Sequence, residues 1–472
     1  MILQKLKTFF ESKLSVAILF ALFFVFNILD LFYINLILAS LFILFTFVFC
    51  DDVTNFFAPI LVISFLIKPV GFKEYYLWYF ICALVVLIAF VAFIIKRIIK
   101  KDCSIKKGKM FWPLMICFFA FLIGGIIGHF KAINSLYVLG ICFVLYVCYF
   151  IAVNFCKNLK DKMFFILLLS GILIYLCFVV SCIKTGDFIS AVLFRYVTVV
   201  GAQNINVASL FILLGMVASF YMAEKFKKFD YLFYALAVVM CASVVTTFCR
   251  GSIFIAIIAF LALTIILFIK SKHKWQLGII TIAVVAILGI SILAGNNLIN
   301  GVIDTLITKI KTGSDGREEL WPWCFNKFKQ NWAFGIGFIS EEPVPTVASN
   351  MVLAHNTILQ WLTSLGVFGS LLISVFYYGK YKQLFKGVNK NRFFVVFLIL
   401  VIAVSGVFDQ AAAMDIFTNI VVLIMLATVE EENQQPSVAE KIDAVDSVLE
   451  SEQKIVDAKE TKNDATEKKK QI

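Results

Sequence analysis

Long uncharged apolar runs dominate this sequence and restrict what it can fold into. Runs of about 16–23 residues recur from residue 14 to residue 429, each long enough to cross a hydrocarbon core of about 30 Å as a helix. The chain is 62% hydrophobic with a mean hydropathy of +0.96, well above the values of soluble domains. We therefore predict an all-α polytopic membrane protein.

The runs predict about fourteen transmembrane helices, or twelve if a short pair is re-entrant. The first run lacks the small-residue cleavage site of a signal peptide, so we expect it to be retained as a span. The predicted spans lie near 14–29, 32–50, 56–71, 76–98, 111–129, 134–156, 163–183, 205–224, 229–248, 251–270, 276–295, 356–378, 393–408 and 414–429.

Lysine and arginine alternate between the connections in the way that the positive-inside rule describes. With a cytoplasmic N-terminus, the predicted inner connections around 96–109, 157–162, 225–228, 270–274 and 380–392 carry most of the basic residues. The net charge of +12 is therefore explained by topology and gives no reason to expect a nucleic-acid partner. We place both termini in the cytoplasm.

Two longer connections, 184–204 and 296–355, fall on the outer side in this topology. The second contains Trp321, Trp323 and Trp332, which a disordered linker would lack. Within it, SDGREELWPWCFNKFK predicts a short amphipathic helix on the outer membrane face, capped by Asp315 with Glu318 three residues later, and kinked or restarted at Pro322.

The composition changes abruptly at residue 430. Residues 430–472 form a mixed-charge segment, which we predict to be a partly disordered cytoplasmic tail. Residues 1–429 are then a single transmembrane domain that includes the outer loop 296–355.

Cysteines and acidic residues give no sign of a metal site. The twelve cysteines lie almost entirely in apolar runs without a C-x-x-C pair, which favours buried free thiols. The acidic residues of the outer loop form no D-x-D pair. We therefore expect no metal and no cofactor.

Arginines on the predicted outer side run against the orientation rule. Arg250 lies between two apolar runs, and Arg195 and Arg317 come from two other outer segments, so the three could converge on one anion. The alternatives are a snorkelling side chain for Arg250, and surface pairs or headgroup contacts for the other two.

His355 is one of three histidines and precedes an apolar run. It could be a simple helix cap, whereas His129 lies in a short turn and His273 is expected to be a solvated charge in a basic inner loop. A neutral imidazole beside an arginine-lined pocket suits sugar transfer from a diphosphate. The base takes the proton of the attacking hydroxyl, and the guanidinium groups stabilise the departing diphosphate.

Five segments of the sequence resemble the motifs of the O-antigen ligase and polymerase family. TTFCRGSIFIAIIAF resembles its S-R-G-S/A motif, VVGAQNINVAS its G-x-x-x-N-P-N-x-x-A segment, and GREELW, NWAFGIGF and AHNTILQWLTSLGVFG its R-x-x-x-W, G-x-G and H-N-x-x-L-Q-x-x-x-x-x-G-x-x-G series. The resemblance covers about residues 195–372. It departs from the family at Ile205, at Cys249 and at Ala333–Phe334, where the family commonly has proline, serine and proline.

The resemblance implies a GT-C-like, metal-independent transferase that takes glycan from a polyprenyl-diphosphate carrier. It implies that Arg250 and Arg317 contact the diphosphate and that His355 activates the acceptor. Further candidates for substrate binding are Arg195, Asn204, Asn206, Asn356, Gln360 and Trp321. Asn356 could instead bond the loop, and Gln360 could satisfy neighbouring backbone. Gly366 and Gly369 are expected to permit close helix packing.

The function predicted on this basis is an inverting glycan polymerase or ligase at the outer face of a bacterial cytoplasmic membrane. The donor would be an undecaprenyl-diphosphate-linked oligosaccharide and the acceptor a glycan or lipid, in surface polysaccharide synthesis. A polysaccharide flippase is the main alternative, although it should carry charges along a path through its spans. A membrane scaffold would leave the aromatic outer loop without a role.

Overall fold

The structure is a computed structural model in which almost all of the described residues are helical. It describes residues 2–67, 72–99, 105–124, 132–184, 199–201, 203–293, 301, 303–304, 307, 316–338, 340, 343–345, 352–386, 392–408 and 415–434. The prediction of an all-α polytopic membrane protein is confirmed. The GT-C-like architecture remains a prediction.

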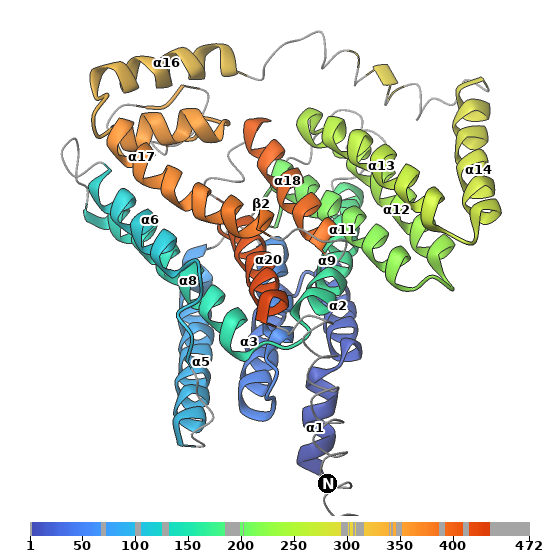
Figure 1. Ribbon diagram of the computed structural model, residues 1–472, viewed down its shortest axis with the longest axis horizontal. Helices are drawn as coiled ribbons and strands as arrows, with labels where there is room; N and C mark the ends of the chain where they lie inside the picture. The colour runs from blue at the N-terminus through green and yellow to red at the C-terminus, as the bar shows by residue number, and fades with distance from the viewer. Residues whose placement is uncertain are drawn as a thin grey trace, which may run out of the picture. The chain divides into compact units, whose positions relative to one another are not determined.

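Each of the fourteen predicted runs coincides with a helix (Figure 1). The elements are α1 (Ile2–Glu11), α2 (Lys13–Ile28), α3 (Phe32–Phe49), η1 (Thr54–Phe56), α4 (Phe57–Leu66), α5 (Phe72–Ile99), α6 (Phe111–Ile123), α8 (Ala132–Phe155), α9 (Leu159–Lys184), β1 (Val199–Val200), β2 (Gln203–Asn204), α11 (Ile205–Lys225), α12 (Asp230–Thr246), α13 (Arg250–Lys270), α14 (Lys274–Leu293), α16 (Arg317–Gln330), α17 (Thr357–Phe385), α18 (Phe393–Phe408) and α20 (Ile416–Gln434). β1 and β2 form a small antiparallel hairpin before α11.

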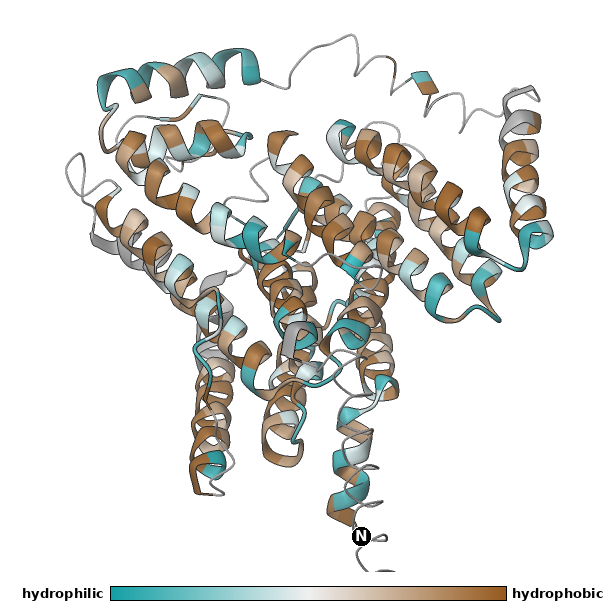
Figure 2. Ribbon diagram, in the orientation of Figure 1, coloured by the Kyte–Doolittle hydropathy of each residue, from teal (hydrophilic) through white to brown (hydrophobic). Residues whose placement is uncertain are grey.

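The number of full-length spans is smaller than the expected 12–14 in the part of the chain that the structure describes. Six helices are long and apolar enough to cross a membrane, or seven if α1 and α2, bent by 71°, count as one broken span. Among the other apolar helices, α4, α6, α12 and α18 have only 10–17 residues. A helix of 13 residues such as α6 rises about 20 Å, less than the hydrocarbon thickness. Figure 2 shows that these helices are apolar and that α16 is largely hydrophilic.

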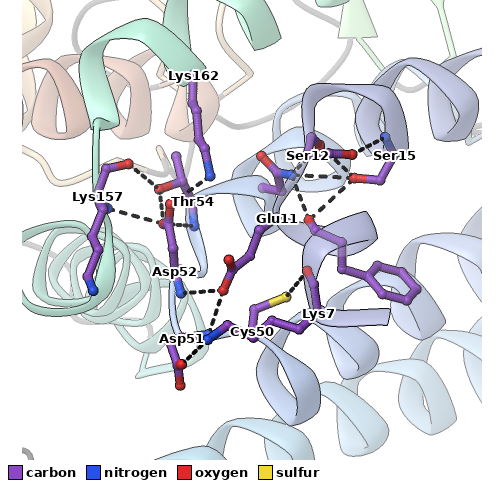
Figure 3. Close-up of polar contacts among 12 residues, drawn as sticks. Lys7, Glu11, Ser12, Ser15, Cys50, Asp51, Asp52, Thr54, Lys157 and Lys162 are labelled. Carbon is purple, nitrogen blue, oxygen red and sulfur yellow. Dashed lines mark hydrogen bonds and ion pairs between the residues drawn. The ribbon is translucent and has the colours of Figure 1, made fainter. Parts of the chain in front are cut away.

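Chain segments predicted to be inner connections meet in one polar cluster (Figure 3). The Asp52 carboxylate accepts hydrogen bonds from Lys162 Nζ at 2.6 Å, from Lys157 N at 3.1 Å and from Thr54 N at 3.0 Å. Glu11 accepts hydrogen bonds from the backbone N–H groups of Asp51 and Asp52. The loop after α3 is thereby tied to the start of α9 and to the end of α1.

Helices α13 and α18 lie antiparallel, and they define two ends of this part of the molecule. Lys270 Nζ, at the end of α13, lies 6.0 Å from the ring centroid of Phe393, at the start of α18. At the other end of the pair, a Cβ added to Gly251 would lie 2.8 Å from Phe408 Cβ. Because α13 has 21 residues, the two ends are about 30 Å apart.

The helix α17 is broken at Gly366, whose φ of 64° and ψ of −166° are not helical. The segment after α16 fills the break. Ile336 N and Gly337 N donate to the carbonyls of Thr363 and Ser364 at 2.9 Å, and Val367 N and Phe368 N donate back to Trp332 and Ala333. A Cβ on Gly366 would lie 2.5 Å from the Ala333 carbonyl carbon, so only glycine fits. Gly366 therefore permits close packing, as expected, but the partner is the chain segment after α16 and not another helix.

The expected start of α16 is wrong in one respect. Its N-cap residue is Gly316, which has a φ of 78° and no side chain with which to cap the helix, whereas the sequence predicts Asp315 at this position. Asp315 lies outside the described residues. Pro322 is accommodated inside α16, which continues to Gln330.

The chain divides into two compact units, Met1–Thr428 and Val429–Ile472. Residues 435–472 of the second unit lie outside the described residues, and the disordered cytoplasmic tail stays a prediction.

Candidate functional site

The starts of α11 and α13 are in direct contact. The Cys249 thiol donates to Asn206 Oδ1 at 3.0 Å, and the hydroxyl oxygens of Ser209 and Ser252 lie 2.7 Å apart. Two of the segments singled out in the sequence, the one with Asn204 and Asn206 and the one with Arg250, are therefore neighbours in space. Asn204 caps α11 by accepting a hydrogen bond from Asn206 N at 2.8 Å.

Arg250 is the first residue of α13 and is half-buried. The turn that precedes it is tight, with Phe248 at a positive φ of 55° and Cys249 as an extended N-cap. This turn makes Arg250 the first residue of α13, at the helix end whose N–H groups have no acceptor within the helix. A helix start with an adjacent arginine is a good environment for an anion.

Arg317 reaches the same region from α16. It is the first residue of that helix, and its Nη2 donates to the carbonyl oxygen of Phe408 at 2.8 Å. Phe408 is also the residue that packs against Gly251, directly after Arg250. The carboxyl end of α18 therefore joins the starts of α13 and α16.

Asn356 brings the start of α17 to this point. Its side chain caps the helix by accepting from Leu359 N at 3.0 Å, and its Nδ2 donates to the Val407 carbonyl at 3.1 Å. The structure thus places Asn356, and with it the neighbouring His355, at the same helix end as Arg317. Of the two roles left open for Asn356, the bond to a loop and helix end is present.

Four helices, α11, α13, α16 and α17, begin in this region. Each helix start carries a partial positive charge of about half a unit, because its first N–H groups lack helical partners. With Arg250 and Arg317 at two of these starts, the region is suited to a polyanion such as a diphosphate.

His355 adopts a backbone conformation that is unusual for a residue with a side chain. Its φ is 49°, in the left-handed region, which costs about 1–3 kcal/mol and persists only where the surroundings enforce it. The surroundings do so through Ala354, the residue before it. Ala354 N donates to Gln360 Oε1, and Ala354 O accepts from Trp321 Nε1, both at 2.9 Å.

The expectation that Gln360 contacts sugar is corrected by these contacts. Gln360 has 0% exposure, and its Nε2 donates to Val352 O and Ser364 Oγ at 2.9 Å. Both ends of the amide are therefore engaged inside the protein, as in the alternative that it satisfies neighbouring backbone. Trp321 uses its single N–H donor on Ala354, while its ring remains 40% exposed.

The helix α16 is fixed on the first half of α17 by a small apolar cluster. Leu320 and Cys324 are buried one turn apart on α16 and pack with Val344, Ala354 and Leu359. Thr363 Oγ1 donates to the Cys324 carbonyl at 3.3 Å. Burial raises the pKa of the Cys324 thiol to about 11, against a smaller lowering by its contact with Thr363, so this cysteine is a protonated packing residue at neutral pH.

The remaining expectations concern Arg195, His273 and a metal site. Arg195 lies outside the described residues. His273, expected to be a solvated charge, instead bonds the buried Asp230 through Nδ1 at 2.7 Å, in the connection after α13 that also contains Ser271. Among the described residues no group of three or more His, Cys, Asp or Glu could hold a metal ion.

Sequence reasoning missed the part played by the carboxyl end of α18. Val407 and Phe408 contribute only main-chain carbonyls to Asn356 and Arg317, and an apolar run gives no signal for such contacts. It also missed the Ser209–Ser252 contact.

The comparisons with known proteins bear on this region. Residues 235–374 match the model of a protein family described as O-antigen ligase. This stretch includes Arg250, Arg317, Trp321, His355 and Gln360 but not Asn204 and Asn206. No curated protein matches the chain.

Proposed function

We propose, from the premise that residues 235–374 form a domain of the O-antigen ligase family, that this chain transfers an oligosaccharide from a polyprenyl-diphosphate carrier to an acceptor hydroxyl. The match to this family supports a glycan ligase or polymerase of the membrane, and the lipid-linked donor and glycan acceptor are part of the proposal. The identity of the donor as an undecaprenyl diphosphate and the inverting, metal-independent course of the reaction belong to the proposal.

One observation carries the proposal: the carboxyl end of α18 gathers the starts of three other helices. Arg317 and Asn356 bond the carbonyls of its last two residues, and Gly251 packs on Phe408. Two arginines and a histidine that are far apart in the sequence therefore belong to one region. A surface of unrelated snorkelling or cap residues would not need this shared anchor.

The chemistry follows from these groups. His355 takes the proton from the acceptor hydroxyl while its oxygen attacks the anomeric carbon of the donor sugar. The bond from that carbon to the carrier diphosphate breaks, and the electron pair leaves with the diphosphate. Arg250, Arg317 and the helix starts stabilise the growing negative charge. Attack opposite the leaving group inverts the anomeric centre.

The region is proposed to face the extracytoplasmic side. Lys270 and its ion-pair partner Glu224 mark the opposite end of α13, where the connections rich in lysine lie, and basic connections are retained in the cytoplasm. Cysteine accessibility in intact cells tests this. A cysteine placed at exposed Glu318 should react with a membrane-impermeant maleimide, and one at Lys272 should react only after permeabilisation. The reverse pattern would overturn the orientation.

Purified protein reconstituted with carrier-linked repeat units tests the reaction. A ladder of products identifies a polymerase, one transfer to a distinct acceptor identifies a ligase, and movement of the donor without bond formation identifies the flippase alternative. His355→Ala and Arg317→Ala should each abolish transfer while retaining membrane insertion. His273→Ala is the matched control, because that histidine pairs with Asp230 and should leave transfer intact. Transfer at the normal rate in His355→Ala would reject the proposed site.

A further inference from the structure

We propose that Gln360 is a positioning residue for His355, holding the backbone before the histidine through a two-sided amide contact. This inference rests on the proposed function and deepens it. Gln360 does not touch substrate. It acts through Ala354 and Val352, which precede His355 in the chain.

Gln360 is itself held firmly in α17. It lies one turn inside α17, and its own N–H donates to Asn356 O at 2.9 Å. Its Nε2 also contacts the hydroxyl of Ser364, a turn further on. With no exposed surface, the amide has a single environment and cannot swing out to solvent.

The Gln360 amide in turn holds the backbone that leads to His355. Its oxygen accepts from Ala354 N and its nitrogen donates to Val352 O, so the segment 352–354 lies against the side of α17. Trp321 Nε1 fixes the Ala354 carbonyl from α16. Both peptide groups that flank Ala354 are thus hydrogen-bonded, one to Gln360 and the other to Trp321. These bonds fix the direction of the backbone where it reaches His355. The positive φ of His355 is the turn that this direction requires.

Only a neutral side chain with one acceptor and one donor can make the contacts to both Ala354 N and Val352 O. A carboxylate accepts from Ala354 N but faces the Val352 carbonyl with a lone pair. A protonated carboxyl restores both contacts, since its C=O accepts and its O–H donates. Gln360→Glu should therefore work when protonated and fail when ionised, and burial raises the pKa of a carboxyl placed there.

The experiment compares the pH dependence of transfer in Gln360→Glu and in the unaltered protein. The ratio of their kcat values should rise by about tenfold or more as the pH falls from about 8 to about 5.5, with KM for the donor unchanged. Gln383→Glu is the matched control. It is a second buried glutamine on α17, 6% exposed, whose amide bonds Leu426 O away from His355. Its ratio should stay flat.

Hydrogen exchange gives a second readout that needs no activity. In Gln360→Leu the amide of Ala354 loses its acceptor, so the peptide spanning 352–355 should exchange faster while peptides of α11 do not. A flat ratio in Gln360→Glu, the same pH response in Gln383→Glu, a rise in KM alone, or unchanged exchange would each overturn the inference. These results are separate from the test of the proposed function, which is transfer by the reconstituted unaltered protein and its loss in His355→Ala.

Discussion

At the scale of the residue, the candidate site depends on side chains that use some of their hydrogen-bonding atoms within the protein and keep others for a ligand. Arg317 donates from Nη2 to the Phe408 carbonyl oxygen at 2.8 Å. A guanidinium has five N–H donors, so others remain for an anion. The residue type alone predicted that Arg317 binds an anion. The bond to the Phe408 carbonyl could not be predicted, because every residue has a main-chain carbonyl.

The variant Arg317→Lys separates charge from geometry. Lysine keeps the positive charge but cannot both bond the Phe408 carbonyl and present a fork of donors. We expect kcat/KM for the carrier-linked donor to fall about 10²- to 10³-fold, measured by product formation in proteoliposomes. Lys329→Ala, an exposed lysine on the same helix, is the control and should leave the rate unchanged. Equal activity of Arg317→Lys and the unaltered protein would show that charge alone suffices.

At the scale of the element, apolar run length predicted where helices lie but not where they break. Each of the fourteen predicted runs contains a helix among the residues that the structure describes, because burial in lipid demands internal hydrogen bonds. The break in α17 depends on Gly366 and on a distant segment, residues 331–338, that supplies replacement hydrogen bonds. Sequence periodicity is local, so it could not reveal this pairing.

The variant Gly366→Ala should disrupt this pairing. Alanine is strained by about 1–3 kcal/mol at this positive φ, and its Cβ would collide with the Ala333 carbonyl group. We expect a lowered thermal midpoint in detergent and loss of transfer. Gly278→Ala is the matched control, because a Cβ there meets nothing within 4 Å. An unchanged midpoint for Gly366→Ala would contradict the described break.

Cys324 provides a chemical test of the contact between α16 and α17. Its thiol has a pKa raised to about 11 by burial, and a thiol reacts as the thiolate. It should therefore remain unmodified by maleimide at pH 8, as read by mass spectrometry of its peptide. Reactivity should rise with pH toward 11 and should rise at pH 8 in Leu320→Ala, which opens the cluster. Rapid modification of the unaltered protein at pH 8 would mean that α16 is not seated on α17.

At the scale of the whole molecule, the charge pattern of the sequence corresponds to contacts between distant segments. Lys162 and Asp52 pair with only 14% and 11% of their side chains exposed, and the same carboxylate binds two backbone N–H groups. Orientation rules predicted that these segments share a side of the membrane. They could not predict which acidic residue would join them.

The variant Asp52→Asn removes the charge from this junction. Because this variant leaves Lys162 without its buried charged partner, we expect the free energy of unfolding to fall by about 3–5 kcal/mol. The measurement is the thermal midpoint of unfolding in detergent, which should fall. Glu224→Gln breaks the more exposed pair with Lys270 and should cost less than about 1 kcal/mol. Similar losses in the two variants would mean that Asp52 is not a buried anchor.

The four helix starts that surround Arg250, Arg317 and Asn356 have a consequence for how an anion is retained there. Main-chain amides neither gain nor lose protons in the physiological range, so their attraction persists unaltered whether the medium is mildly acidic or alkaline. If the proposed function holds, a spent lipid carrier, which is more highly charged than the glycosylated one, is held more strongly by the same fixed dipoles. Departure of the used carrier, rather than formation of the glycosidic bond, is then the event expected to set the turnover rate.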